Sequence, residues 1–135
     1  MTTNLDDNKA VVRQMLAALN DEDWTALEKH PGLTETRQFQ PLMRVAFPDL
    51  KYTIDKELVD GDLIAVRVIA QGTHQGNFMG FAPTGKPVTY QILLIDQIAD
   101  GKIVDHWANP DFVTILRQIG AWPSPSHAEP AESNA

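Results

Sequence analysis

The stretch VTYQILLIDQIADGKIVDHWANPD, residues 88–111, contains the strongest structural signals in this chain. Two runs rich in β-branched and aromatic residues, 88–98 and 102–108, flank the tripeptide Ala-Asp-Gly at 99–101. Asp-Gly between two such runs is typical of a tight β-hairpin, because glycine adopts positive φ without steric cost. The sequence therefore predicts a hairpin of two long antiparallel strands.

A helix is expected directly after this hairpin. Asn109 has the residue type of an N-cap, Pro110 suits the first helical position, and Asp111 would add a carboxylate to the first turn. Gly120 is a natural residue to end a helix over 111–120. Asp111 is thus predicted to lie where the sheet meets the helix, at the mouth of whatever the sheet encloses.

The register of the hairpin determines which side chains share a face of the sheet. A loop of two residues, 100–101, would place Asp96 opposite Asp105, and two like charges destabilise a cross-strand pair. A loop of three residues, 99–101, avoids this and is preferred. One face would then contain Leu93, Ile95, Gln97, Ile103, Asp105 and Trp107. That composition suits either a ligand pocket or a sheet face packed against helices.

The composition limits the class of protein. The chain has 135 residues, of which 43% are hydrophobic and 21% charged, as in an ordinary single globular domain. Its net charge of −7 argues against a nucleic-acid partner. It has neither a long apolar run for a membrane span nor the apolar core of a signal peptide. The absence of cysteine excludes disulfides and thiolate sites, and a cytoplasmic location is expected.

The remaining sequence predicts an α+β fold. Apolar periodicity indicates helices over 6–20, 24–29 and 36–47, and alternation indicates strands over 51–59 and 62–74. Helices grouped before an antiparallel sheet are typical of α+β domains, and a curved sheet wrapped over a helix would leave a conical cavity. A single domain is expected over 1–121, followed by a disordered tail rich in Pro, Ser, Ala and Glu over 122–135.

The connection QGNFMGFAPTGKP, residues 75–87, contains three large apolar side chains: Phe78, Met79 and Phe81. A loop seldom has so many unless it folds back over another part of the protein. These residues are expected either to cap the core or to form one wall and lid of a cavity. The segment lacks the residue order of a phosphate-binding loop.

Several motifs at characteristic spacing suggest a family. GTHQGNFMGFAPTGKPV (72–88), DGKIVDHW (100–107), PD (110–111) and LRQIG (116–120) together resemble the SnoaL-like polyketide cyclase family. The resemblance implies an NTF2-like, or cystatin-like, α+β cone: N-terminal helices packed in a curved antiparallel sheet of about four strands, with a short C-terminal helix. It also implies a homodimer with a mainly apolar pocket, no metal and no cofactor.

The resemblance also suggests a set of site residues. Family cyclases close a ring by intramolecular aldol condensation of an aromatic polyketide ester, with an aspartate as acid/base. The matching residue is Asp111, and Gln97 stands where those members have an assisting histidine. Burial against Trp107 and Phe78 would raise the pKa of Asp111, which the helix N-terminus lowers. The predicted substrate-binding residues are Gln97, His74, Trp107, Phe78, Met79 and Ile95.

Two classes of function remain open at this point. The first is a cofactor-independent cyclase, isomerase or lyase that acts on a small apolar or aromatic carbonyl compound. The second is a non-catalytic protein of the same fold that binds a small ligand or serves as a dimeric scaffold. The segment HPGLTE, 30–35, is shorter than its counterpart in the family, so part of the usual pocket wall is expected to be absent or rebuilt.

Overall fold

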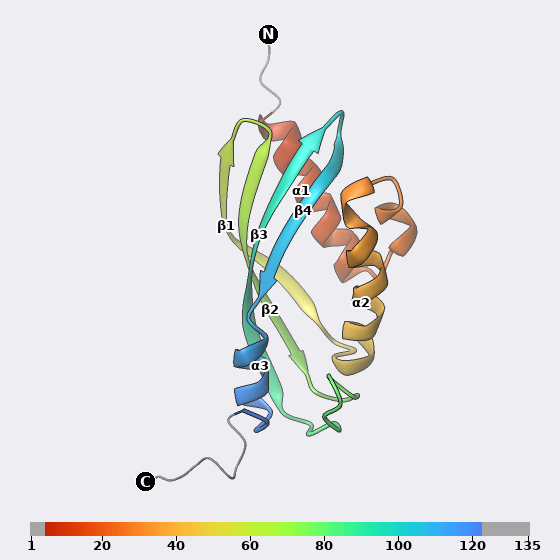
Figure 1. Cartoon of the computed structure of the whole chain (residues 1–135), viewed down its shortest axis with the longest axis vertical. Coiled ribbons are helices and arrows are strands. Elements are labelled where there is room, and N and C mark those ends of the chain that lie inside the picture. The colour runs from red at the N-terminus through yellow and green to blue at the C-terminus, as the bar shows by residue number, and fades with distance from the viewer. Residues whose placement is uncertain (1–4, 123–135) are drawn as a thin grey trace.

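The computed structural model describes residues 5–122, and its order of elements confirms the predicted α+β class (Figure 1). The elements are α1 (Leu5–Asn20), the 3-10 helices η1 (Trp24–Leu27) and η2 (Pro31–Leu33), α2 (Thr34–Ala46), β1 (Lys51–Asp60), β2 (Leu63–Thr73), β3 (Pro87–Ala99), β4 (Lys102–Pro110) and α3 (Phe112–Gln118). None of the helices described is long and apolar enough to span a membrane. The predicted tail lies, from residue 123 onward, outside the described residues.

The four strands form one curved antiparallel sheet in the order β1-β2-β3-β4, and α1 and α2 cover one of its faces (Figure 1). Side chains alternate between the two faces, as in any strand. On β2, for example, Ile64, Val66 and Val68 are buried under the helices, whereas the residues between them are half-buried on the other face. We call the helix-covered side the inner face and the opposite side the outer face.

The β3–β4 hairpin turns through two residues, Asp100 and Gly101, so the predicted three-residue loop is wrong. Both residues have positive φ, 53° and 74°, and Ala99 pairs directly with Lys102. Two consecutive residues with positive φ form the tight turn whose twist matches that of the strands it connects. Asp-Gly thus forms the shorter of the two loops considered.

A bulge on β4 changes the register just after this turn. Val104 has no partner on β3, and from there Gln97 lies opposite Asp105 and Asp96 lies opposite His106. The extra residue removes the Asp96–Asp105 pairing that argued against a short loop. It also places Asp96 and His106 side by side on the inner face.

The junction between β4 and α3 lies later in the chain than predicted. Asn109 and Pro110 still belong to β4, where they pair with Leu93 and Ile92, so their predicted roles as N-cap and first helical residue are wrong. Proline is tolerated at this place because β4 is an edge strand and Pro110 ends it. The N-cap of α3 is Asp111 itself.

An aromatic core lies where α2 ends and the loop after β2 folds back, at the bottom of Figure 1; we call this the lower end of the cone. Phe47 is fully buried, and its ring centroid lies 5.3 Å from that of Phe78 and 5.8 Å from that of His74. The loop after β2 folds back onto this core because Gln75 N and Gly76 N both donate to Ala46 O, at 3.0 and 3.1 Å. Phe78 therefore caps the core, one of the two roles expected for this loop.

We predict that Phe47→Ala lowers the free energy of unfolding by about 3–5 kcal/mol, because it leaves a large cavity among rigid neighbours. The matched control is Leu42→Ala on α2, where the side chain is exposed and the change is expected to be within about 0.5 kcal/mol. Urea denaturation of the three proteins measures both values. Equal losses in the two variants would show that the Phe47 cluster is not a rigid core.

Candidate functional site

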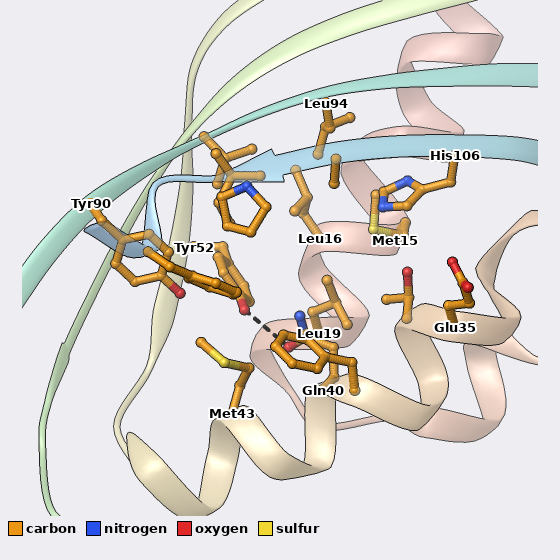
Figure 2. Close-up of a pocket in the computed structure, with 17 residues that line it drawn as sticks. Met15, Leu16, Leu19, Glu35, Gln40, Met43, Tyr52, Tyr90, Leu94 and His106 are labelled. Carbon is orange, nitrogen blue, oxygen red and sulfur yellow. Dashed lines mark hydrogen bonds between the residues drawn. The ribbon is translucent and has the colours of Figure 1, made fainter. Parts of the chain in front are cut away.

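A cavity of about 240 Å³ lies between the inner face of the sheet and the helices α1 and α2 (Figure 2). Its walls are mainly apolar, with polar groups at both ends. The lining residues are Met15, Leu16, Leu19, Glu35, Thr36, Phe39, Gln40, Met43, Tyr52, Val68, Tyr90, Ile92, Leu94, His106, Ala108, Pro110 and Phe112. This combination of an apolar wall with a few polar groups is typical of a small-molecule site.

The periodicity of the sequence explains how these residues come together. On α2, Thr36, Gln40 and Met43 lie three or four positions apart and therefore share one side of the helix. On β3, Tyr90 and Leu94 point inward because alternate residues of a strand share a face. The pocket is thus a space between the inner face of the sheet and the helices that the side chains of both leave unfilled.

One end of the pocket contains a buried histidine–aspartate pair. His106 Nδ1 is hydrogen-bonded to Asp96 Oδ1, and the side chain of Asp96 is fully buried. An ionised carboxylate only accepts hydrogen bonds, so Nδ1 is the donor and Nε2 is left to accept or donate on its other side. His106 lines the pocket, whereas Asp96 lies behind it and holds its ring in place. This is the arrangement of a general base with an orienting carboxylate.

The short segment 30–35 lies at this same end of the pocket, where Glu35 is part of the lining. Its 3-10 helix η2 packs on β4, where Ile103 N donates to His30 Nδ1 at 2.9 Å. Burial lowers the pKa of His30, which favours the neutral ring that this hydrogen bond requires. Glu35, the last residue of the segment, belongs to the first turn of α2, and Figure 2 shows it at the same end of the pocket as His106.

The other end of the pocket has two tyrosines and a glutamine. Tyr52 Oη donates to Gln40 Oε1 at 3.0 Å, and the hydroxyl of Tyr90 lies near them (Figure 2). Burial raises the pKa of both tyrosines, so both hydroxyls remain protonated near neutral pH.

Asp111, the predicted catalytic residue, does not line the described pocket, although its neighbours Pro110 and Phe112 do. Its carboxylate caps α3: Oδ1 accepts from Thr114 N at 3.1 Å, and Oδ2 accepts from Thr114 Oγ1 at 2.6 Å. These two hydrogen bonds lower the pKa of Asp111. The carboxylate is therefore engaged in a helix cap, outside the described pocket.

Three of the predicted substrate-binding residues lie on the outer face of the sheet. Ile95 and Trp107 are cross-strand partners there and are 43% and 52% exposed. Gln97 also lies on this face, where its Nε2 donates to Asp62 Oδ2 at 3.0 Å. The sequence grouped these residues correctly, but their face points away from the described cavity because the adjacent residues Asp96 and His106 point inward.

The other three lie at the lower end of the cone, outside the described pocket. His74 is fully buried, and its Nδ1 lies 3.0 Å from Thr84 Oγ1 and accepts from Thr84 N at 3.2 Å. Phe78 belongs to the aromatic core and contacts Phe112, with ring centroids 5.7 Å apart. Met79 is 65% exposed on the loop.

The residues that line the polar ends of the pocket were not selected from the sequence. Neither hairpin register considered placed Asp96 opposite His106, because the bulge at Val104 leaves no clear sequence signal. The alternation of Tyr90, Ile92 and Leu94 was visible, and it indicates that Tyr90 shares a face with Asp96.

We predict that Asp111→Asn lowers stability most near neutral pH. The folded-state pKa of Asp111 lies below its ordinary value of 3.8, so its charge stabilises the fold above that pH and this contribution is lost as the pH falls further. Chemical denaturation of wild type and Asp111→Asn at several pH values measures the difference, which should shrink below pH 3.8. A difference independent of pH would mean that the charge of Asp111 does not stabilise α3.

Comparison with known proteins places the chain in a family of known fold. The family model for SnoaL-like polyketide cyclases matches residues 4–119. Aklanonic acid methyl ester cyclase DnrD of Streptomyces peucetius is 31% identical over 114 residues, which cover 78% of this chain and 76% of that protein. Aklanonic acid methyl ester cyclase DauD of Streptomyces sp. (strain C5) is also 31% identical over 114 residues, covering 78% and 68%.

Solved structures agree with this match. AclR, a proposed hydroxylase from Streptomyces galilaeus, superimposes with a TM-score of 0.80 at 29% identity, covering 88% of this chain and 84% of that chain. TsrD from Streptomyces laurentii has a TM-score of 0.77 at 25% identity, covering 86% and 96%. The NTF2-like cone expected from the sequence motifs is confirmed, and the chain belongs to the SnoaL-like polyketide cyclase family.

Proposed function

We propose that this protein is a cofactor-independent ester cyclase that closes a ring in an aromatic, polyketide-type carbonyl ester by intramolecular aldol condensation. The observation that supports this best is the His106–Asp96 pair, which presents a ring nitrogen at one end of an apolar pocket. The names of the relatives DnrD and DauD, both methyl ester cyclases, support the same reaction class.

In the proposed reaction, His106 Nε2 removes a proton from the carbon next to a substrate carbonyl. The resulting enolate attacks a second carbonyl of the same molecule, so a carbon–carbon bond forms and an alkoxide develops. The proton on His106 then returns to that alkoxide. Asp96 fixes the ring orientation and stabilises the positive charge that His106 carries between the two transfers. No atom is gained or lost, so the product has the mass of the substrate.

Asp111, which the family resemblance suggests as acid/base, competes with His106 for this role. Its two chain neighbours, Pro110 and Phe112, line the pocket, but Asp111 itself does not. Its lowered pKa makes it a weak base, and both its oxygens are already bound by Thr114. We therefore assign proton transfer to His106 and helix capping to Asp111.

We predict that His106→Gln lowers kcat by roughly 10²–10⁴, the usual contribution of a general acid–base group. Asp96→Asn should also lower kcat, since an amide can bind the ring nitrogen but cannot balance its charge. Asp111→Asn should retain most of the activity, because Asn is also a good N-cap. The assay is turnover of aklanonic acid methyl ester, followed by chromatography and mass spectrometry.

The same assay separates the alternatives. Loss of turnover in Asp111→Asn, with His106→Gln still active, would transfer the acid/base role to Asp111. A product that contains one more oxygen atom would indicate a hydroxylase, the activity proposed for AclR. Tight binding of the ester without any turnover would favour the second class considered, a non-catalytic ligand-binding protein.

We also propose that the protein is a homodimer formed through the outer face of the sheet. Leu58, Ala65, Ile95 and Trp107 are successive cross-strand partners on β1, β2, β3 and β4. They form a continuous apolar belt across the whole sheet, and Leu58 at one end is 72% exposed. An exposed apolar row of this kind marks an interaction surface. A second copy of the chain offers the same row, as a two-fold interface requires.

We predict that Trp107→Lys converts the dimer to a monomer, because it places a charge at one end of the apolar belt. The control is Leu42→Lys, which changes an apolar side chain of similar exposure on α2, away from the outer face of the sheet. Sedimentation velocity distinguishes the two states. A monomeric wild type, or a dimer that both variants retain, would contradict the proposed interface.

A further inference from the structure

The hydroxyl of Tyr90 is a hydrogen-bonding group without a partner. Tyr90 is only 3% exposed, it lines the pocket, and among the described residues its Oη has no hydrogen-bond partner. Buried hydroxyl groups are usually bonded, since leaving one unpaired costs free energy. An unpaired hydroxyl on a pocket wall is therefore a candidate ligand contact.

The nearest possible acceptor for the Tyr90 proton is the hydroxyl of Tyr52, which lies beside it and donates its own proton to Gln40. No hydrogen bond of ordinary geometry joins the two tyrosine hydroxyls, so a ligand oxygen can compete for the Tyr90 proton. Burial raises the pKa of Tyr90, so it stays a neutral hydroxyl near neutral pH. Tyr90 can thus offer its proton to an oxygen in the pocket.

A buried positive charge lies behind these tyrosines. Arg44 is buried, its Nη2 donates to Leu19 O at 2.7 Å, and its Nη1 donates to Leu50 O. Within residues 5–122 no carboxylate forms an ion pair with Arg44. Its charge acts on both hydroxyls, since it lowers the pKa of Tyr52 and Tyr90 against the larger effect of burial. This end of the pocket therefore favours a partial negative charge.

The opposite end has the reverse polarity. His106 is backed there by the Asp96 carboxylate, and Glu35 on α2 lines the same end of the pocket (Figure 2). An acceptor oxygen is repelled by these carboxylates and attracted by Arg44 and the tyrosine proton. The two ends of the pocket are thus electrostatically distinct.

From these observations we infer that Tyr90 binds a carbonyl or phenolate oxygen of the substrate and thereby determines which end of the molecule reaches His106. This inference rests on the proposed function, because it assigns the orientation of the substrate in the same pocket. The hydrogen bond between Tyr52 and Gln40 fixes the position of the Tyr52 ring beside Tyr90.

The spacing of the two ends indicates the shape of the ligand. His106 lies opposite Asp96, which is six residues from Tyr90 along β3, or about 20 Å between Cα atoms at the usual rise of a strand. The side chains of His106 and Tyr90 both extend into the cavity, so the distance between their polar atoms is shorter than the distance between their Cα atoms. The preferred ligand is therefore an elongated, mostly apolar molecule with an acceptor oxygen far from the carbon that loses its proton.

The test uses two unreactive probes, 1-tetralone and tetralin, which differ in one carbonyl oxygen. Calorimetric titration gives the Kd of each probe for wild type, Tyr90→Phe and the control Thr36→Val, which also removes a hydroxyl from the wall but at the Glu35 end. Tyr90→Phe should weaken tetralone binding roughly 2- to 13-fold and leave tetralin unchanged. Thr36→Val should change neither value.

Two results would overturn the inference. The first is an equal effect of Tyr90→Phe on both probes, or loss of the tetralone preference in Thr36→Val alone. The second is a lower urea midpoint of unliganded Tyr90→Phe, which would show that the hydroxyl stabilises the fold instead of waiting for a ligand. Because neither probe reacts, these results are independent of turnover, and an inactive His106→Gln enzyme would leave them unchanged.

Discussion

The hydrogen bond between His106 and Asp96 is the interaction on which the site depends. It joins two adjacent strands across the inner face of the sheet, and it exists because the bulge at Val104 moves His106 opposite Asp96. Without that extra residue, Asp96 would face Asp105, and two carboxylates would be opposed across the strands. A buried carboxylate needs a partner, and here the partner is a ring that also faces the cavity. The local irregularity of β4 therefore relieves the repulsion between two carboxylates and places the ring of His106 on the wall of the pocket.

The two faces of the sheet present different surfaces. The inner face encloses a cavity that has an acidic end near His106 and an electropositive end near Tyr90, where Arg44 lies behind the wall. The outer face presents an apolar belt that ends at Trp107 and suits a second copy of the chain. Because adjacent residues of a strand point to opposite faces, His106 lines the pocket and Trp107 is exposed on the outer face, although they are neighbours in sequence.

Most of the fold could be predicted from the sequence, because it depends on signals that are local. The Asp100-Gly101 turn, the apolar periodicity of the helices and the alternation of β2 each determine an element without reference to the rest of the chain. The site could not be predicted to the same degree, because it depends on register. Side chains alternate between the two faces of a strand. An assignment that places Ile95 and Trp107 on the inner face therefore places Asp96 and His106 on the outer face. The family motifs point to the neighbourhood of Asp111, but only the structure shows that its carboxylate caps α3.

The position of the His106–Asp96 pair is itself an argument for function. Replacing a buried ion pair by apolar residues of similar volume is often neutral or stabilising, so such a pair is weak evidence for stability. The surrounding inner face is built from Ile, Val and Leu, and an apolar pair at 96 and 106 would fit that pattern. The second oxygen of Asp96 has no hydrogen-bond partner among the described residues, which adds to the cost of burying it. A group kept at such cost, with its partner on the wall of a cavity, is best explained by chemistry that takes place in that cavity.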